Sequence, residues 1–279
     1  MILPTITNLQ RAVPTTVGIK NFSDVEPYIE SAELWLRNNI LGPTLYDRID
    51  GDPTENEILT RLCQSVIGNH AYWDAIPFLD LVHTDSGFAV ISATNKVPAS
   101  KERVERLREQ CLIRRDNEVE SLISWLEEHE DFHSDWEGSA AYSILTDCLI
   151  RTANELQQYG QWTGTRKDFL QQRPKLIQET MTKLEHVFST DYIEELIQKQ
   201  RDGDTTGDDQ KVLVLLKYAL GSIINGNNEA AVKIMSDALR YMDKHITSFP
   251  TYTASDEYKA RTAEGYTNTF TSPIFSSIY

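Results

Sequence analysis

The sequence predicts a mainly α-helical protein built as a helical bundle. Apolar residues recur every three to four positions over most of the 279 residues, as in Ile29, Leu36 and Ile40, and Gly42 ends that stretch. Residues 101–129 show the same periodicity, and their many acid–base pairs at i,i+4 are typical of a partly solvated helix. The chain is 40% hydrophobic and 25% charged, a composition that favours an ordered, soluble protein.

The elements follow from their start and stop signals, with Ser23 and Ser100 as candidate N-caps. Two β-prone runs on either side of Asp85-Ser86-Gly87 predict one small β-hairpin at about 79–91. Residues 1–21 and 249–279 lack helical periodicity, so we expect extended N- and C-terminal arms. The expected helices cover about 26–41, 44–49, 58–73, 101–129, 139–159, 173–188, 191–200, 209–225 and 227–246.

An apparent internal duplication relates the two ends of the helical region. Ile29, Leu36, Ile40, Leu45 and Ile49 align at one offset with Ile177, Leu184, Phe188, Ile193 and Ile197. An acidic loop beginning Asp-Gly-Asp follows each set, at 50–54 and at 202–206, although chance similarity between amphipathic helices remains an alternative. The predicted organisation is an arm (1–21), a first helical unit plus hairpin (22–98), long central helices (99–165), a second helical unit (166–248) and an arm (249–279).

The charge balance limits the possible partners. The chain has 27 Lys and Arg against 42 Asp and Glu, a net charge of −15. Tight binding to DNA or RNA needs cations on phosphates, so it is disfavoured, while an acidic wall past which DNA moves is compatible with this charge. No apolar run is long enough to cross a membrane. Three scattered cysteines without a CxxC pair argue against a disulfide framework and favour a reducing compartment.

One motif raises the question of a zinc enzyme. Residues 129–133 read His-Glu-Asp-Phe-His, which matches H-E-x-x-H. On one helix His129 and His133 would grip zinc, Glu130 would act as base, and Glu155 is the candidate third ligand. The acidic neighbours and the position at a helix end favour another interpretation, in which both histidines interact with the helix C-terminus. We therefore expect no catalytic residue and no metal or cofactor.

A second acidic stretch resembles a calcium loop only in part. Asp202, Asp204 and Gly207 match positions 1, 3 and 6 of the EF-hand pattern, but position 12 is Leu213 where a bidentate glutamate is needed. An exposed acidic turn is the preferred interpretation.

The C-terminal stretch carries isolated aromatic residues: Tyr252, Tyr258, Tyr266, Phe270, Phe275 and Tyr279. An irregular segment cannot bury such side chains by itself, so they are candidates for binding pockets on a neighbouring chain. A segment that folds back over its own core is the alternative.

Three stretches carry a resemblance to a known family. They are "VEPYIESAELWLRNNILGPTLYDRI", "FLDLVHTDSGFAVISATNKVPASKERVERL" and "LISWLEEHEDFHSDWEGSAAY". The first contains A-x3-L followed by L-G-x2-L-Y, at Ala32, Leu36, Leu41, Gly42, Leu45 and Tyr46. With them the chain resembles the head–tail connector (adaptor) proteins of tailed bacteriophages, in particular a group from phages and prophages of gut bacteria.

The resemblance implies a structural virion protein that assembles in the host cytoplasm. Such a subunit would form a homo-oligomeric ring, a dodecamer, between the portal protein and tail or further connector proteins, with DNA passing through unbound. The length of the chain and its apparent duplication depart from a simple connector. Two other classes remain open: a zinc-dependent hydrolase that uses residues 129–133, and a monomeric helical protein-binding module.

Overall fold

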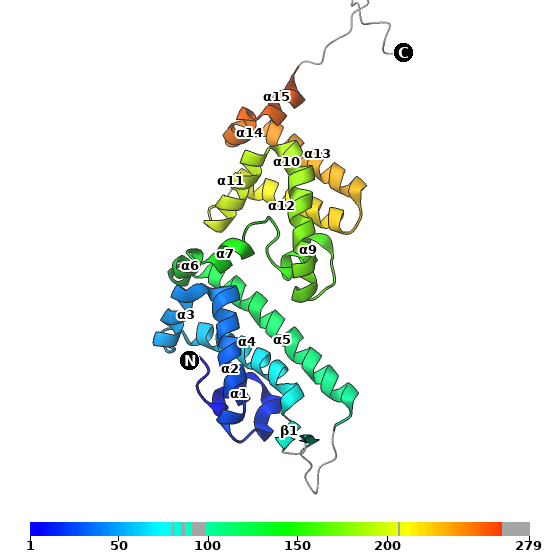
Figure 1. The fold of residues 1–279 in the computed structure, drawn as a ribbon. Helices are drawn as coiled ribbons and strands as arrows, with labels where there is room; N and C mark the ends of the chain where they lie inside the picture. The colour runs from blue at the N-terminus through cyan, green and yellow to red at the C-terminus, as the bar shows by residue number, and fades with distance from the viewer. Residues whose placement is uncertain (80, 85–86, 91–98, 206, 264–279) are drawn as a thin grey trace, which may run out of the picture. The chain divides into compact units, whose positions relative to one another are not determined.

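The computed structural model describes residues 1–79, 81–84, 87–90, 99–205 and 207–263. It confirms a mainly α-helical protein (Figure 1). The chain divides into two compact units, residues 1–174 (unit 1) and 175–279 (unit 2).

Unit 1 has its core where α2, α4 and α5 pack together. Its α-helices are α1 (Ile6–Ala12), α2 (Glu26–Leu36), α3 (Gly42–Gly51), α4 (Glu57–Ala75), α5 (Lys101–Glu128), α6 (Glu130–Glu137), α7 (Ala140–Leu145), α8 (Ala153–Gly160) and α9 (Arg166–Glu179), the last of which runs on past Pro174. Its short helical turns are η1 (Pro14–Gly18), η2 (Phe22–Asp24), the π-helical η3 (Arg37–Leu41) and η4 (Ile76–Phe78).

A sharp corner joins η3 to α3 at Gly42. Its φ of +75° lies in the region that favours glycine, and a Cβ there would overlap the side chain of Ser139. Ser139 in turn caps α7 by accepting a hydrogen bond from the Tyr142 backbone N–H at 3.0 Å. The corner therefore depends on a residue without a side chain at position 42.

The prediction of an extended N-terminal arm over residues 1–21 is wrong, because this stretch forms α1 and η1. Thr5 caps α1, and the side chains of Ile2, Leu3 and Leu9 are buried in the core of unit 1. The buried carboxylate of Glu33 accepts the Leu3 backbone N–H at 2.9 Å. Proline and β-branched residues suggest extended chain, but burial on α4 overrides that local preference.

The stretch expected to form the hairpin at about 79–91 contains two short paired strands. They are β1 (Leu81–Thr84) and β2 (Gly87–Val90), antiparallel, with Leu81 opposite Val90 and Thr84 opposite Gly87. Residues 80, 85–86 and 91 lie outside the described residues.

The helix expected over 139–159 is two helices, α7 and α8. Between them the chain is irregular, with Leu149 and Ile150 fully buried, and Thr152 then caps α8 by accepting a hydrogen bond from the Glu155 backbone N–H. The expected cap at Ser23 is also wrong, since it lies in η2 and Val25 precedes α2.

Unit 2 is built around α12 and α13, which pack against each other. Its elements are η5 (Thr180–Leu184, π-helical), α10 (Glu185–Phe188), α11 (Thr190–Arg201), α12 (Gly207–Ile224), α13 (Asn228–Lys244), η6 (Ile246–Ser248), α14 (Pro250–Ala254) and α15 (Asp256–Thr262), preceded by the end of α9. The prediction of an extended C-terminal arm is therefore wrong for residues 249–262, which contain α14 and α15. The rest of the predicted arm, residues 264–279, lies outside the described residues.

Both units contain the same succession of elements around their acidic loops. A helix with a π-helical turn reaches a residue with positive φ, Gly42 (+75°) in unit 1 and Ser189 (+69°) in unit 2. A shorter helix, α3 or α11, follows, then the Asp-Gly-Asp loop and a long apolar helix, α4 or α12.

Candidate functional site

The two histidines of the zinc-like motif lie at the junction of α5 and α6, not on one continuous helix. His129 is outside both helices, with φ −119° and ψ 92°. Its Nδ1 lies 2.7 Å from the Trp125 carbonyl oxygen. Nδ1 of His133 lies 3.3 Å from the Leu126 carbonyl oxygen. Both rings therefore contact carbonyls in the last turns of α5, the arrangement that the helix-terminus interpretation predicts.

The same histidines take part in aromatic packing. The His129 ring stacks on Trp125 at 3.7 Å between centroids, and His133 packs edge-on against Trp136 and Tyr142. Glu155, the candidate third ligand, accepts the Arg151 backbone N–H at 2.6 Å. Among the described residues, no group of three or more His, Cys, Asp or Glu side chains could hold a metal ion.

Carboxylates in and just after the acidic loop that follows α11 accept hydrogen bonds from other side chains of unit 2. Lys199 bonds Asp209 at 2.6 Å, and Ser248 donates to Asp208 at 2.6 Å. Asp202 accepts from the Gln198 side chain at 2.8 Å, which places it at the end of α11. Asp202, Asp204 and Gly207 are exposed, as expected of an exposed acidic turn.

The aromatic residues proposed to bind a partner separate into three groups. Tyr252 is fully buried against Phe188 and Tyr192, which corrects the expectation that it reaches a neighbouring chain. Tyr258 is half-buried beside Tyr252 and under the Arg261 guanidinium. Tyr266, Phe270, Phe275 and Tyr279 lie outside the described residues.

The buried thiols are poor nucleophiles. Burial raises the pKa of Cys63 to about 12 and that of Cys148 to about 11, and it also raises the pKa of Cys111. At neutral pH each therefore stays a thiol, whereas attack needs the thiolate.

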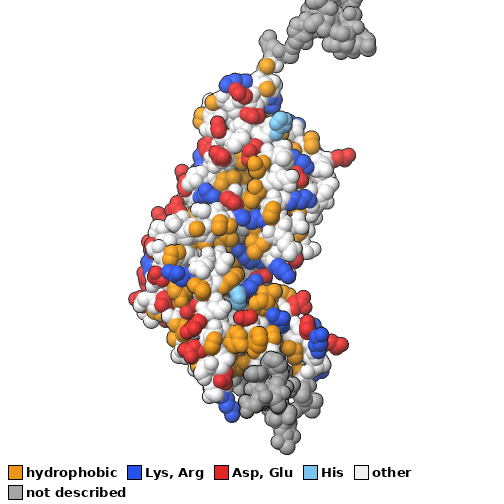
Figure 2. Space-filling model, viewed as in Figure 1, with side chains coloured by type: hydrophobic (Ala, Val, Ile, Leu, Met, Phe, Trp, Pro, Cys, Tyr) orange, Lys and Arg blue, Asp and Glu red, His pale blue; other side chains and the backbone are white. Residues whose placement is uncertain are grey.

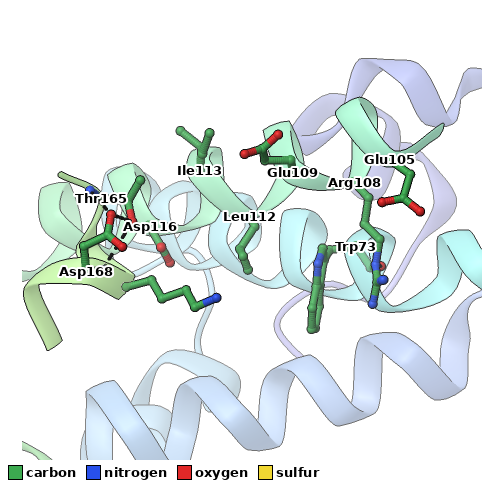
Figure 3. A pocket seen from close by; sticks show the side chains of 10 residues that line it. Trp73, Glu105, Arg108, Glu109, Leu112, Ile113, Asp116, Thr165 and Asp168 are labelled. Atoms are coloured by element: carbon green, nitrogen blue, oxygen red, sulfur yellow. Dashed lines mark hydrogen bonds between the residues drawn. The ribbon is translucent and has the colours of Figure 1, made fainter. Parts of the chain in front are cut away.

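The groove that sequence reasoning did not find lies on the outer face of α5 (Figure 3). Its cavity volume is about 440 Å³, which is within the range of ligand pockets. Trp73 of α4 forms one side, and residues 165–168 border the other. Glu105, Glu109, Leu112, Ile113 and Asp116 line it from α5. The i, i+4, i+7, i+11 spacing of Glu105, Glu109, Leu112 and Asp116 is the sequence signal for this shared face.

Hydrogen bonds and ring contacts fix both ends of this groove. Arg108 stacks on Trp73, with its guanidinium carbon 4.9 Å from the ring, and donates from Nε to the Trp73 carbonyl oxygen at 3.3 Å. At the other end Asp168 accepts the Thr165 backbone N–H at 2.8 Å, and this bond is the largest cause lowering the Asp168 pKa. Both ends are thus held by contacts within unit 1.

Comparison with known proteins gives a family but no characterised relative. The family of unknown function DUF6712 matches residues 13–144 and 215–262, more than half of the chain. The chain belongs to this family. No curated protein and no solved structure matches it significantly.

The DUF6712 match covers several of the residues described above. It includes the Gly42 corner, residues 129–133, and the α4 and α5 sides of the groove, but not residues 165–168. None of the described helices combines the length and apolar composition needed to cross a bilayer.

Proposed function

We propose that this DUF6712 protein is a structural, non-enzymatic connector subunit of a tailed-phage virion. In this proposal copies of the chain form a ring, expected to be a dodecamer, that joins the portal protein to tail or further connector proteins. DNA passes through the ring without specific binding.

The observation that carries the proposal is the packing of two stretches behind the resemblance, residues 25–49 and 122–142. The Trp136 indole N–H donates to the Ile40 carbonyl oxygen at 2.6 Å. Arg48 donates to the Asp131 carbonyl oxygen at 2.8 Å and to the Asp135 carboxylate at 2.6 Å. These sequence-distant contacts make one substructure, and the family match covers all of it.

The motif A-x3-L with L-G-x2-L-Y has a definite structural role in that substructure. Ala32, Leu36, Leu41 and Leu45 are buried, and Gly42 makes the corner. The Tyr46 hydroxyl donates to Glu33 at 2.8 Å, and that carboxylate also holds the N-terminal residues. The resemblance therefore rests on residues that determine the shape of unit 1.

Charge supports the same proposal. Residues 1–174 carry 16 Lys and Arg against 27 Asp and Glu. Figure 2 shows Asp and Glu side chains distributed over the described part of the face drawn, rather than gathered in one patch. A surface of this sign repels phosphates, as suits a passage that must not retain DNA.

A monomeric protein-binding module is a second candidate because of the groove on α5. It differs from a connector in remaining a monomer. Nothing in the geometry of His129, His133 and Glu155 favours the zinc hydrolase, since each makes the structural contacts described above.

The deciding experiment is native mass spectrometry of the chain purified with zinc, alone and mixed with the portal protein of the same phage or prophage. The proposal expects a metal-free ring in at least one of the two samples. A chain truncated after residue 263 tests the remaining aromatics, Tyr266, Phe270, Phe275 and Tyr279, and is expected to lose assembly while keeping the helices of residues 1–263. A monomer in both samples would overturn the connector proposal, and a monomer with one zinc would favour the hydrolase.

A further inference from the structure

One face of α5 carries a row of carboxylates. Glu105, Glu109, Asp116 and Glu120 recur at spacings of four, seven and four residues, which keeps them on the same side of the helix. Leu112 lies in the same row, between the two pairs.

The C-terminal half of this row is covered by the chain itself. Asp116 and Glu120 are each only 3% exposed. Arg115 bonds Asp116 at 2.5 Å, and Arg166, which is also buried, pairs with Glu120. The Asn154 backbone N–H adds a bond to Glu120 at 3.4 Å. The start of α9, which packs on this face, therefore supplies an arginine to Glu120.

The N-terminal half of the row is uncovered. Glu105 and Glu109 are exposed and make no hydrogen bond or ion pair with any residue that the structure describes. Beside them Leu112 and Ile113 are half-buried and line the groove together with the indole of Trp73. Two like charges one turn apart on a helix repel each other, so a cation placed between them would be stabilising.

We infer that this groove binds a segment of a partner protein that carries an arginine beside an apolar side chain. The arginine pairs with Glu105 and Glu109, as Arg166 pairs with Glu120, and the apolar side chain packs on Leu112 and Ile113. The inference deepens the proposed function, because a connector has partner subunits and the groove would be one contact with them.

Two peptides test this inference on the full chain. The probe is a fluorescently labelled hexapeptide of alternating leucine and arginine, and the control replaces each arginine by citrulline, which has nearly the same shape without the charge. We expect the arginine peptide to bind at least about tenfold more tightly, a ratio that corresponds to about 1.4 kcal/mol. Absence of binding at about 1 mM, the range of weak contacts, would overturn the inference.

Matched variants locate the binding. Glu105→Gln with Glu109→Gln should weaken binding about tenfold. Glu118→Gln with Glu128→Gln removes the same charge from α5, and Glu118 lies on the opposite side of the helix from Glu109. This control should change binding less than about twofold. Equal losses in both variants would mean general attraction to an acidic protein and would overturn the inference.

The outcome is separable from that of the assembly experiment. A chain that forms a ring but does not prefer the arginine peptide overturns only the groove inference. A chain that binds the peptide through Glu105 and Glu109 but stays a monomer with and without the portal protein overturns the connector proposal and leaves a binding module.

Discussion

Gly42 shows how one residue sets the geometry of a unit. Its φ and ψ of +75° and 167° lie in a region that residues with a side chain rarely adopt, and Ser139 fills the space where a Cβ would stand. Any residue with a side chain at position 42 would therefore meet both backbone strain and steric overlap with Ser139.

Gly42→Ala should destabilise unit 1 by about 3 kcal/mol, because it combines strain with overpacking. The measurement is the urea midpoint followed by tryptophan fluorescence. Gly51→Ala is the matched control, since a Cβ there meets no atom within 4 Å and φ is not positive. Its free energy of unfolding should stay within about 0.5 kcal/mol of the wild-type value. Equal effects of the two substitutions would contradict the argument.

His70 couples the aromatic packing of unit 1 to pH. Its ring packs against Trp35 and Trp73 with centroid distances of 4.6 and 5.7 Å, and Nδ1 has no hydrogen-bond partner among the described residues. Burial, followed by the charge of Arg115, lowers the pKa of His70 to about 4. The folded protein therefore holds the neutral imidazole.

Because the folded pKa is lower than the unfolded value of 6.5, the contribution of His70 to stability is complete above pH 6.5 and is lost as pH falls towards 4. Allowing for its partial exposure, we expect a loss of about 2 kcal/mol over this window. Urea unfolding of wild type and His70→Phe from pH 4 to pH 8 measures it. An unchanged pH slope in His70→Phe would show that other groups are responsible.

At the level of elements, a buried ion pair holds the start of α9 on α5. Arg166 and Glu120 are both about 4% exposed as side chains, and they join positions 46 residues apart in the chain. Removing one partner leaves a buried charge, whereas replacing both by apolar residues does not.

Arg166→Met should therefore destabilise unit 1 by about 3–5 kcal/mol. Thermal unfolding, together with limited proteolysis of residues 151–168, measures the effect. The double variant Glu120→Leu/Arg166→Met should recover most of the loss. A double variant as unstable as the single one would mean that the pair matters for its hydrogen bonds rather than for its charge balance.

At the scale of the whole molecule, the two units should unfold as separate cooperative steps. All five tryptophans, at positions 35, 73, 125, 136 and 162, belong to residues 1–174, and residues 175–279 have none. Tryptophan fluorescence thus reports unit 1 alone, while far-UV circular dichroism reports the helices of both units.

We expect the two probes to give different urea midpoints, because a chain with two cores need not unfold in one transition. Gly42→Ala should lower the urea midpoint measured by fluorescence. The part of the dichroism transition that reports unit 2 should keep its midpoint. Coincident transitions in both proteins would contradict independent units.

Local patterns were enough to predict the helical class, the long helix over about 101–129, which is found at 101–128, and the contacts of His129 and His133 at a helix end. These follow from periodicity and from charge near a helix terminus, which are local properties. The DUF6712 family match adds no known activity to them.

The burial of side chains within residues 1–21 and 249–262 and the position of the groove depend on tertiary packing and could not be predicted from local patterns. Ile2, Leu3 and Tyr252 have no helical pattern around them, yet each is buried on residues far along the chain. Likewise, Glu105 and Glu120 share one helix face in sequence, but the segment carrying Arg166 covers only one of them. Long-range packing is the reason, since no local preference states which part of a helix another segment will bury.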